Sequence, residues 1–354
     1  MTDTLSTPVF SGRGYVGNGM GLAAQFIAQQ MQTLGMDVQM QPFTYPVNRF
    51  ANGMELSING RLLTPGVHYL VNPGSQSCRA SGALTGIDSL LYVNKKQAVA
   101  IRMMPSKLTW SVATAQNNFT EFWVKDTTIG KPERFDALVD AEYVPDFSAQ
   151  NVQGFLRGTA QTDSLLVFTA HYDHLGMMGA NTMFAGANDN ASGVALMLSL
   201  AKHYAANPPR FNMLFLAFGG EEAGLIGSKY YVEHPLVSLK KIRFLINLDL
   251  VGNGEEGITV VNATEHKAAF LHLQKLNQQH GWFTAVNGRG KAANSDHYWF
   301  SQSGVPAFFI YTLGARKSYH DVDDVAATLR WPEAHDLQQM LLAFANSLML
   351  DCCW

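Results

Sequence analysis

Histidines and carboxylates follow several apolar runs of this 354-residue chain, and together they could bind a metal ion. "LLVFTA" leads into His171, "MLFLAFGG" into Glu221 and Glu222, and "FLINL" into Asp249, while a short loop separates "AFFIYT" from His320. Imidazole and carboxylate ligands suit zinc, and manganese or cobalt accept the same groups. The pattern therefore indicates a metal centre.

Asp189 completes this set, because it lies in the polar turn of "GANDNASG" directly before a helical stretch. An open catalytic zinc site takes about three protein ligands. Two histidines, two aspartates and one glutamate make five ligands, which are too many for one such site and one too few for two. A shared aspartate resolves the count, so we predict two metal ions with a bridging carboxylate.

The adjacent acids Glu221 and Glu222 need separate roles. Successive side chains of an extended backbone point to opposite sides, so the two cannot face one metal in the same way. One carboxylate can coordinate while the other exchanges protons with a water molecule at the site, first as a general base and then as a general acid. The residues alone leave open which acid takes which role.

The elements that must position these groups alternate between strand and helix from Asn151 onward. Continuous apolar runs are typical of strands buried on both faces of a parallel sheet, and ligands bind beyond the carboxyl ends of such strands. We predict an α/β three-layer sandwich with a mostly parallel central sheet. The predicted strands are "DSLLVFTAH", "FNMLFLAF", "IRFLINLDL", "GITVVN" and "VPAFFIYT", and the predicted helices are "GLAAQFIAQQMQTLGM", "SGVALMLSLAKHYAAN", "ATEHKAAFLHLQKLNQQH" and "WPEAHDLQQMLLAFANSLML".

A segment with a different sequence pattern interrupts this predicted domain. Residues 46–149 consist of short alternating pieces such as "MELSING" and "TEFWVKD" between turn residues, which predicts a β-rich insertion. The catalytic domain is accordingly discontinuous, over residues 1–45 and 150–354. The glycines of "GRGYVG" (residues 12–17) match a dinucleotide-binding pattern, but neither a strand before them nor an acid after the next strand supports a nucleotide site.

Composition excludes several function classes. The net charge of -3, without a block of lysine or arginine, argues against nucleic-acid binding, and no apolar run reaches the ~18 residues of a membrane span. Three cysteines without a C-x-x-C motif form neither a disulfide framework nor a zinc ribbon. We interpret the adjacent Cys352 and Cys353 as bystanders.

The ordered motifs "HYDHLG", "GANDNASG", "GGEEAG", "INLDLVG", "SDHYWF" and "YHDVDD" resemble those of the co-catalytic dizinc aminopeptidase family. That family includes bacterial leucyl-type aminopeptidases, glutamate-carboxypeptidase relatives and glutaminyl cyclases. The resemblance covers residues 10–45 and 150–350. The insertion occupies the position at which larger members carry a protease-associated domain. Residues 46–149 resemble that domain weakly, and we expect them to form a reduced version of it.

The resemblance also implies roles for individual residues. One zinc would be held by His171, Asp189 and Asp249, and the other by Asp189, Glu222 and His320. Relatives often have a cis peptide bond after the bridging aspartate, so one is expected between Asp189 and Asn190. Among the supporting groups, Glu221 would be the general base, Asp173 would orient His171, Tyr319 would donate a hydrogen bond to the oxyanion, and Asp324 would add further support.

The implied function is that of a zinc exopeptidase, an aminopeptidase that hydrolyses N-terminal residues from peptides through a metal-bound hydroxide, with Glu221 as base. A glutaminyl cyclase-type acyltransferase and a carboxypeptidase of the same family are the alternatives, and a receptor without metal is disfavoured because all five ligand positions are filled. The substrate would be a peptide with a free N-terminus. Side-chain preference and the number of subunits stay open. Relatives with this opening are mostly exported, so we expect a periplasmic or secreted protein whose signal peptide is absent here, with the cytoplasm as the alternative.

Overall fold

An eight-stranded sheet lies at the centre of the region that carries the predicted motifs. The computed structural model describes residues 1–126 and 128–350, so Cys352 and Cys353 lie outside the described residues. In sheet order the strands are β1 (Asp37–Arg49), β11 (Glu142–Leu156), β15 (Asn212–Phe218), β12 (Leu165–His171), β16 (Ile242–Leu248), β19 (Ala307–Leu313), β17 (Gly257–Val261) and β18 (Val286–Gly288).

The sheet is mixed, which corrects the expectation of a mostly parallel sheet. Strands β15, β12, β16 and β19 are parallel to one another, but β1 pairs with β11, β11 with β15, and β17 with β19 in the antiparallel direction. Pro42 and Pro46 lie in β1, where they are tolerated because β1 is an edge strand. The parallel core of the prediction therefore holds for the four central strands.

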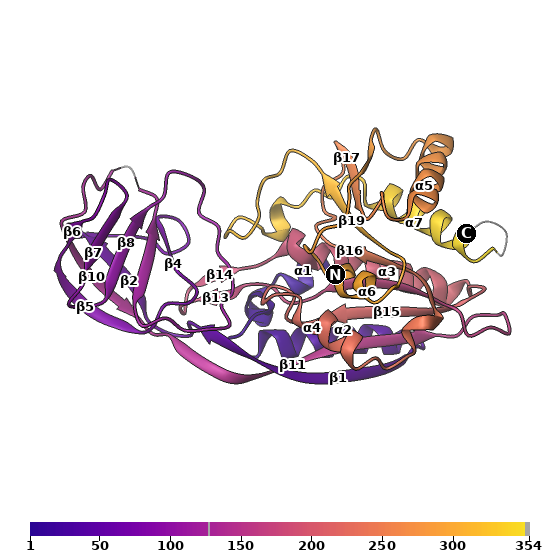
Figure 1. Cartoon of the computed structure of the whole chain (residues 1–354), viewed down its shortest axis with the longest axis horizontal. Coiled ribbons are helices and arrows are strands. Elements are labelled where there is room, and N and C mark those ends of the chain that lie inside the picture. The colour runs from indigo at the N-terminus through magenta and orange to yellow at the C-terminus, as the bar shows by residue number, and fades with distance from the viewer. Residues whose placement is uncertain (127, 351–354) are drawn as a thin grey trace.

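Helices cover both faces of the sheet and form the outer layers of a three-layer sandwich (Figure 1). One face is covered by α2 (Gly19–Thr33), α3 (Gly193–Ala206) and α7 (Ala334–Leu348), with α5 (Lys267–His280) packed against α7. The other face is covered by α4 (Ile226–Glu233) and α6 (His297–Gln302). Shorter helices are α1 (Thr2–Leu5), η1 (Pro8–Arg13), η2 (Ala187–Ser192), η3 (Leu239–Lys241) and η4 (Ala326–Thr328).

Alternation along the central strands divides the core into two layers. In β12, Leu166 and Phe168 join the cluster beneath α2, α3 and α7, whereas Leu165 and Val167 join the cluster beneath α4 and α6. All of these side chains are buried, as expected for a strand with apolar residues on both faces. Among the described residues, no helix combines the length and the apolar character needed to cross a membrane.

Most of residues 46–149 form a second, β-rich lobe at the left of Figure 1. One sheet has the order β3-β2-β10-β5 and the other β4-β9-β8-β7-β6. Their strands are β2 (Met54–Ile58), β3 (Arg61–Leu62), β4 (Tyr69–Val71), β5 (Cys78–Ala83), β6 (Thr85–Gly86), β7 (Leu91–Asn94), β8 (Val99–Met103), β9 (Thr120–Val124) and β10 (Arg134–Val139). The division at residues 46 and 149 stays a prediction, since β1 and β11 run continuously through both positions.

A small hairpin from the region of the eight-stranded sheet packs into the core of the insertion. This hairpin consists of β13 (Gly176–Met178) and β14 (Thr182–Phe184). Met178 and Phe184 are fully buried in the apolar cluster of the insertion, and Phe184 stacks on Trp110 with ring centroids 4.8 Å apart. The insertion is therefore joined to the region of the eight-stranded sheet by shared apolar packing as well as by the two long strands.

Candidate metal centre

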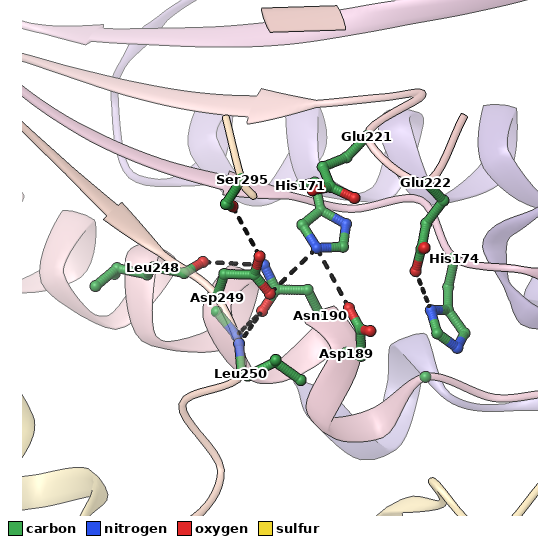
Figure 2. A network of polar contacts seen from close by, with 12 residues as sticks. His171, His174, Asp189, Asn190, Glu221, Glu222, Leu248, Asp249, Leu250 and Ser295 are labelled. Atoms are coloured by element: carbon green, nitrogen blue, oxygen red, sulfur yellow. Dashed lines mark hydrogen bonds and ion pairs between the residues drawn. The ribbon is translucent and has the colours of Figure 1, made fainter. Parts of the chain in front are cut away.

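The five predicted ligand residues meet at the carboxyl ends of the central parallel strands, and Figure 2 labels four of them, all except His320. His171 is the last residue of β12, Glu222 follows β15, and Asp249 follows β16. Asp189 lies in η2, and His320 is in the loop after β19. This placement follows from topology, because parallel strands bring their carboxyl ends to one edge of the sheet.

Asp189 stands between the two histidines. Its Oδ1 lies 3.3 Å from Nε2 of His171, and its Oδ2 lies 3.2 Å from Nε2 of His320. Nε2 of His171 is also 3.3 Å from Oδ1 of Asp249, and Nε2 of His320 is 3.1 Å from Oε2 of Glu222. The arrangement is thus two ligand clusters that share one carboxylate.

These separations fit metal ligation. Two donor atoms bound at about 2.0–2.1 Å to one tetrahedral zinc lie ~3.3–3.4 Å apart. The four nitrogen–oxygen distances, from 3.1 to 3.3 Å, are close to that separation and longer than the usual charged hydrogen bond of ~2.8 Å. The residues present therefore fit a zinc ion in each cluster.

Hydrogen bonds to the main chain orient both imidazole rings. Nδ1 of His171 lies 3.1 Å from the carbonyl oxygen of Asp173, and Nδ1 of His320 lies 2.9 Å from that of Trp110. A carbonyl oxygen accepts only from a protonated nitrogen, so each ring carries its proton on Nδ1 and leaves Nε2 free for a metal.

Asp173 supports the centre in a different way from the predicted one. Its carboxylate lies 3.8 Å from Nδ1 of His171, beyond hydrogen-bond distance, and instead accepts from the amides of Glu221 and Glu222 at 3.1 and 3.2 Å. The carboxylate fixes the backbone of both glutamates, and only the main chain of Asp173 orients His171. Burial raises the pKa of Asp173 to about 7.

The two adjacent glutamates lie in a turn, so the expectation that an extended backbone separates them is wrong. Gly220 has a φ of 74°, which favours glycine, and the amides of Gly224 and Leu225 donate to the carbonyl oxygen of Glu221. The turn directs the Glu221 carboxylate toward His171 and the Glu222 carboxylate toward His174 (Figure 2).

His174 is a neighbour that sequence reasoning did not assign to the site. It is fully buried, and its Nδ1 lies 2.7 Å from Oε1 of Glu222. Although His174, Asp189 and Glu222 lie close enough to form a metal cluster of their own, 2.7 Å is a hydrogen-bond length and shorter than the separation of two zinc ligands. We therefore assign His174 to holding Glu222, whose other oxygen faces His320.

Asp249 and the η2 turn receive comparable support. Oδ2 of Asp249 accepts a 2.7 Å hydrogen bond from the hydroxyl of Ser295, which leaves Oδ1 toward His171. The buried carboxylate of Asp324 accepts from the amides of Asn188 and Asp189 at 2.9 to 3.1 Å. The peptide bond between Asp189 and Asn190 is cis, as expected.

Arg13 was missed altogether by sequence reasoning. Its guanidinium is fully buried and donates to five carbonyl oxygens, those of Leu5, Tyr172, Ala185, Gly186 and Asp189, at 2.6 to 3.3 Å. The glycines of "GRGYVG" allow this burial, because a Cβ on Gly12 would meet the Phe184 carbonyl at 2.3 Å and one on Gly14 would meet Gly176 at 2.5 Å. The glycine pattern thus serves close backbone packing beneath the metal centre.

The electrostatic environment shifts the pKa values of Glu221 and Glu222 in opposite directions. Burial, reinforced by the negative charges of Glu222 and Asp249, raises the pKa of Glu221 well above its ordinary value despite the opposing effect of His171. Burial also acts to raise the pKa of Glu222, but His320 and His174 outweigh it and hold that pKa below its usual range. Opposite shifts in neighbouring acids indicate one proton-transferring group and one charged ligand.

A cavity of ≈ 200 Å³ opens beside the clusters. Apolar groups of Leu250, Phe309 and Tyr311 line it together with Arg289 and Asn294. Tyr319 lines it as well and stacks on the His320 ring at 3.9 Å, although its side chain is 46% exposed. Partial burial and the nearby carboxylates raise the pKa of the Tyr319 phenol, so it remains a proton donor at neutral pH.

A larger cavity of ≈ 490 Å³ lies at the opposite end of β16, where Ile242 begins the strand. Lys240, Arg243 and Lys267 line it with a single acid, Glu265. It holds too few metal ligands to compete with the clusters around Asp189.

The sequence is similar to those of known peptidases. The model of peptidase family M28 matches residues 151–345. The aminopeptidase YwaD of Bacillus subtilis is 31% identical over 196 residues, which cover 50% of this chain and 40% of that protein. The chain spans less than half the length of the curated relatives it matches.

Solved structures share the fold over nearly the whole chain. The M28 peptidase precursor of Shewanella amazonensis superposes with a TM-score of 0.72 at 17% identity, covering 98% of this chain and 95% of that one. BSAP, a zinc aminopeptidase from Bacillus subtilis, superposes with a TM-score of 0.71 at 19% identity, covering 98% and 94%. At these identities the likeness shows the fold.

Proposed function

The chain belongs to peptidase family M28, and on that basis we propose that it is a dizinc aminopeptidase. The observation that carries the proposal is the position of Asp189, whose two oxygens face His171 and His320 at 3.3 and 3.2 Å. His171, Asp189 and Asp249 would hold one zinc, and Asp189, Glu222 and His320 the other. Bound zinc would polarise the scissile carbonyl and lower the pKa of water.

Glu221 is the proton-transfer group of the proposed reaction. One oxygen of its carboxylate lies within 4.8 Å of a ring nitrogen of His171 and of the Glu222 carboxylate. A carboxylate with a raised pKa can accept a proton from the attacking water and deliver it to the leaving amine. Asp173 keeps the Glu221 backbone in place through its 3.1 Å contact with the amide.

Two further groups orient the substrate. The phenol of Tyr319, on the rim of the cavity, would donate a hydrogen bond to the oxygen that becomes negative in the transition state. Leu250, Phe309 and Tyr311 give the cavity apolar walls, which suit the side chain of the first residue of a peptide.

The decisive experiment compares free and N-acetylated versions of the same short peptides, incubated with zinc-loaded protein. An aminopeptidase cleaves the free peptides, and acetylation abolishes cleavage. Equal cleavage of both versions would rule out the aminopeptidase. Incubation with a glutamine-initiated peptide separates the acyltransferase, which would cyclise the N-terminus, and release of C-terminal residues would indicate a carboxypeptidase.

Metal stoichiometry is tested separately. Two zinc ions per chain are expected by elemental analysis of protein dialysed against low zinc, and the Asp189→Asn variant should lose both because it removes the shared carboxylate charge. One ion in the wild-type protein would contradict the dizinc centre. Export from the cytoplasm stays a prediction that follows from the family resemblance.

A further inference from the structure

A second cavity adjoins the metal centre on the side of the insertion. This cavity, of ≈ 380 Å³, is lined from the insertion by Met104, Leu108, Thr109, Trp110, Ser111 and Trp123, and from the loop after β19 by Tyr319 and His320. We name it the insertion groove. Tyr319 and His320 also line the cavity beside the metal ligands, so these two residues separate the two spaces and belong to both.

The wall of the groove is held in fixed relation to the metal ligand His320. The amide of Trp110 donates to the His320 carbonyl at 2.8 Å, and the Trp110 carbonyl accepts from Nδ1 of His320 at 2.9 Å. The Trp110 ring is buried, stacks on Phe184, and donates from Nε1 to the carbonyl of Val71 at 2.7 Å. The wall of the groove is therefore hydrogen-bonded directly to a residue of the second ligand cluster.

Apolar and aromatic residues make up most of the groove lining, to which Thr109 and Ser111 add two hydroxyl groups. In the described chain no aspartate, glutamate, lysine or arginine lines it, whereas the neighbouring metal cavity contains four carboxylates and Arg289. Met104 and Trp123 are half-buried, so each presents part of an apolar side chain to the groove. Binding of apolar or aromatic groups to such a surface is favourable, because it removes apolar area from water.

We propose that the insertion groove binds apolar or aromatic side chains on the C-terminal side of the scissile bond, at the second and third residues of the peptide. The inference rests on the proposed aminopeptidase function, which places the first residue in the metal cavity. An extended peptide advances about 3.4 Å per residue, so the chain beyond the first residue must leave that small cavity at once. The groove offers it a surface that begins at Tyr319.

The test compares leucinamide, Leu-Gly-Gly and Leu-Phe-Phe as substrates of the zinc-loaded protein. The wild-type protein should prefer Leu-Phe-Phe over Leu-Gly-Gly by about tenfold or more in kcat/KM, since one buried aromatic ring contributes at least that factor. Trp123→Ala should remove most of this preference. Thr109→Trp fills the groove from an exposed loop position and should remove the preference as well. This second variant tests the groove even if Trp123→Ala fails to fold.

Phe119→Ala is the matched control, because Phe119 is an aromatic residue of the insertion that is 37% exposed and lies outside the groove. It should keep the wild-type preference. An unchanged ratio of Leu-Phe-Phe to Leu-Gly-Gly in both groove variants would overturn the proposal, as would a wild-type protein without any preference.

Equilibrium binding to the Glu221→Gln variant separates this proposal from the proposed function. Titration calorimetry with the same peptides measures the preference when hydrolysis is blocked. Retention of the Leu-Phe-Phe preference, and its loss on adding Trp123→Ala, would support the groove even if the wild-type protein hydrolyses none of the three. Equal dissociation constants for Leu-Phe-Phe and Leu-Gly-Gly would overturn the groove whatever the activity.

Discussion

Trp110 and His320 are joined by a reciprocal pair of hydrogen bonds, one from the Trp110 amide to the His320 carbonyl and one from His320 Nδ1 to the Trp110 carbonyl. Trp110 belongs to the insertion, and His320 is a predicted metal ligand. The insertion thus takes part in building the second ligand cluster, because it sets which nitrogen of His320 carries the proton and where the ring points. Removing the insertion would remove that support.

Lys107 strengthens the same junction. Its ammonium pairs with the Asp321 carboxylate and donates to the carbonyl of Lys317 at 2.7 Å. Lys107→Met should therefore loosen the loop around His320 and weaken the zinc held by His320 roughly tenfold, while the zinc held by His171 keeps its affinity. Chelator competition resolves the two affinities. Lys96→Met, at an exposed position of the insertion, is the control, and an equal loss at both sites would contradict the prediction.

Glu221→Gln should abolish catalysis without disturbing the metals. The amide cannot accept the proton of water, so kcat should fall by about 10²–10⁴-fold. Elemental analysis should still find the wild-type zinc content, whereas Glu222→Gln should lose the zinc nearest His320. Glu256→Gln, at an exposed glutamate, should behave as wild type. Full activity in Glu221→Gln would exclude Glu221 as the base.

Arg13→Met should destabilise the fold strongly. The substitution removes five hydrogen bonds to buried carbonyl groups, of which that of Gly186 keeps a second donor in the Ala191 amide, and the loss should reach roughly 3–5 kcal/mol. Arg13→Lys keeps the charge but supplies at most three donors, so its loss should be intermediate. Urea unfolding measures both. Wild-type stability in Arg13→Lys would show that charge, rather than the five-donor geometry, is what matters.

Zinc binding should release about two protons and tighten as the pH rises. Burial alone would lower the pKa of both imidazoles, but the carboxylates around them raise the pKa of His320 to about 11 and that of His171 well above its ordinary value. In the metal-free protein the charged rings stabilise the fold. This stabilisation is complete at any pH below ~6.5, the pKa of a histidine in the unfolded chain, and it is lost as the pH rises through the raised pKa values of the folded protein.

A metal binds only the neutral ring, so each histidine must give up its proton, and the overall affinity should rise by up to a hundredfold per pH unit. Calorimetric titrations in buffers of different ionisation enthalpy count the protons directly. Binding without proton release would mean that both rings are already neutral in the metal-free protein and would contradict the prediction.

The ligand cluster could be predicted from sequence because each member follows an apolar run. His171, Glu222 and Asp249 stand at or just beyond the ends of parallel strands, and one rule of topology brings such ends together. Arg13 and His174 carry no such signal. The contact of Arg13 with Gly186 spans 173 residues, and the contact of Trp110 with His320 spans 210. No local periodicity encodes pairings of that kind.

The antiparallel edge of the sheet was missed for a related reason. In β1 the prolines Pro42 and Pro46 interrupt the alternation that marks a strand, and Pro46 falls where the register with β11 shifts. Its partner strand β11 begins inside the stretch that composition assigned to the insertion. The four buried central strands were predicted correctly, since burial on both faces leaves an uninterrupted apolar run.

The long ribbon of β1 and β11 has an evolutionary consequence. The chain departs toward the insertion and returns on adjacent strands, with Asn48 directly opposite Tyr143. The points at which the chain enters and leaves the insertion therefore have a fixed spacing, which does not depend on the segment between them. A module of another size or shape could therefore replace the insertion during evolution without rebuilding the eight-stranded sheet or the ligand clusters.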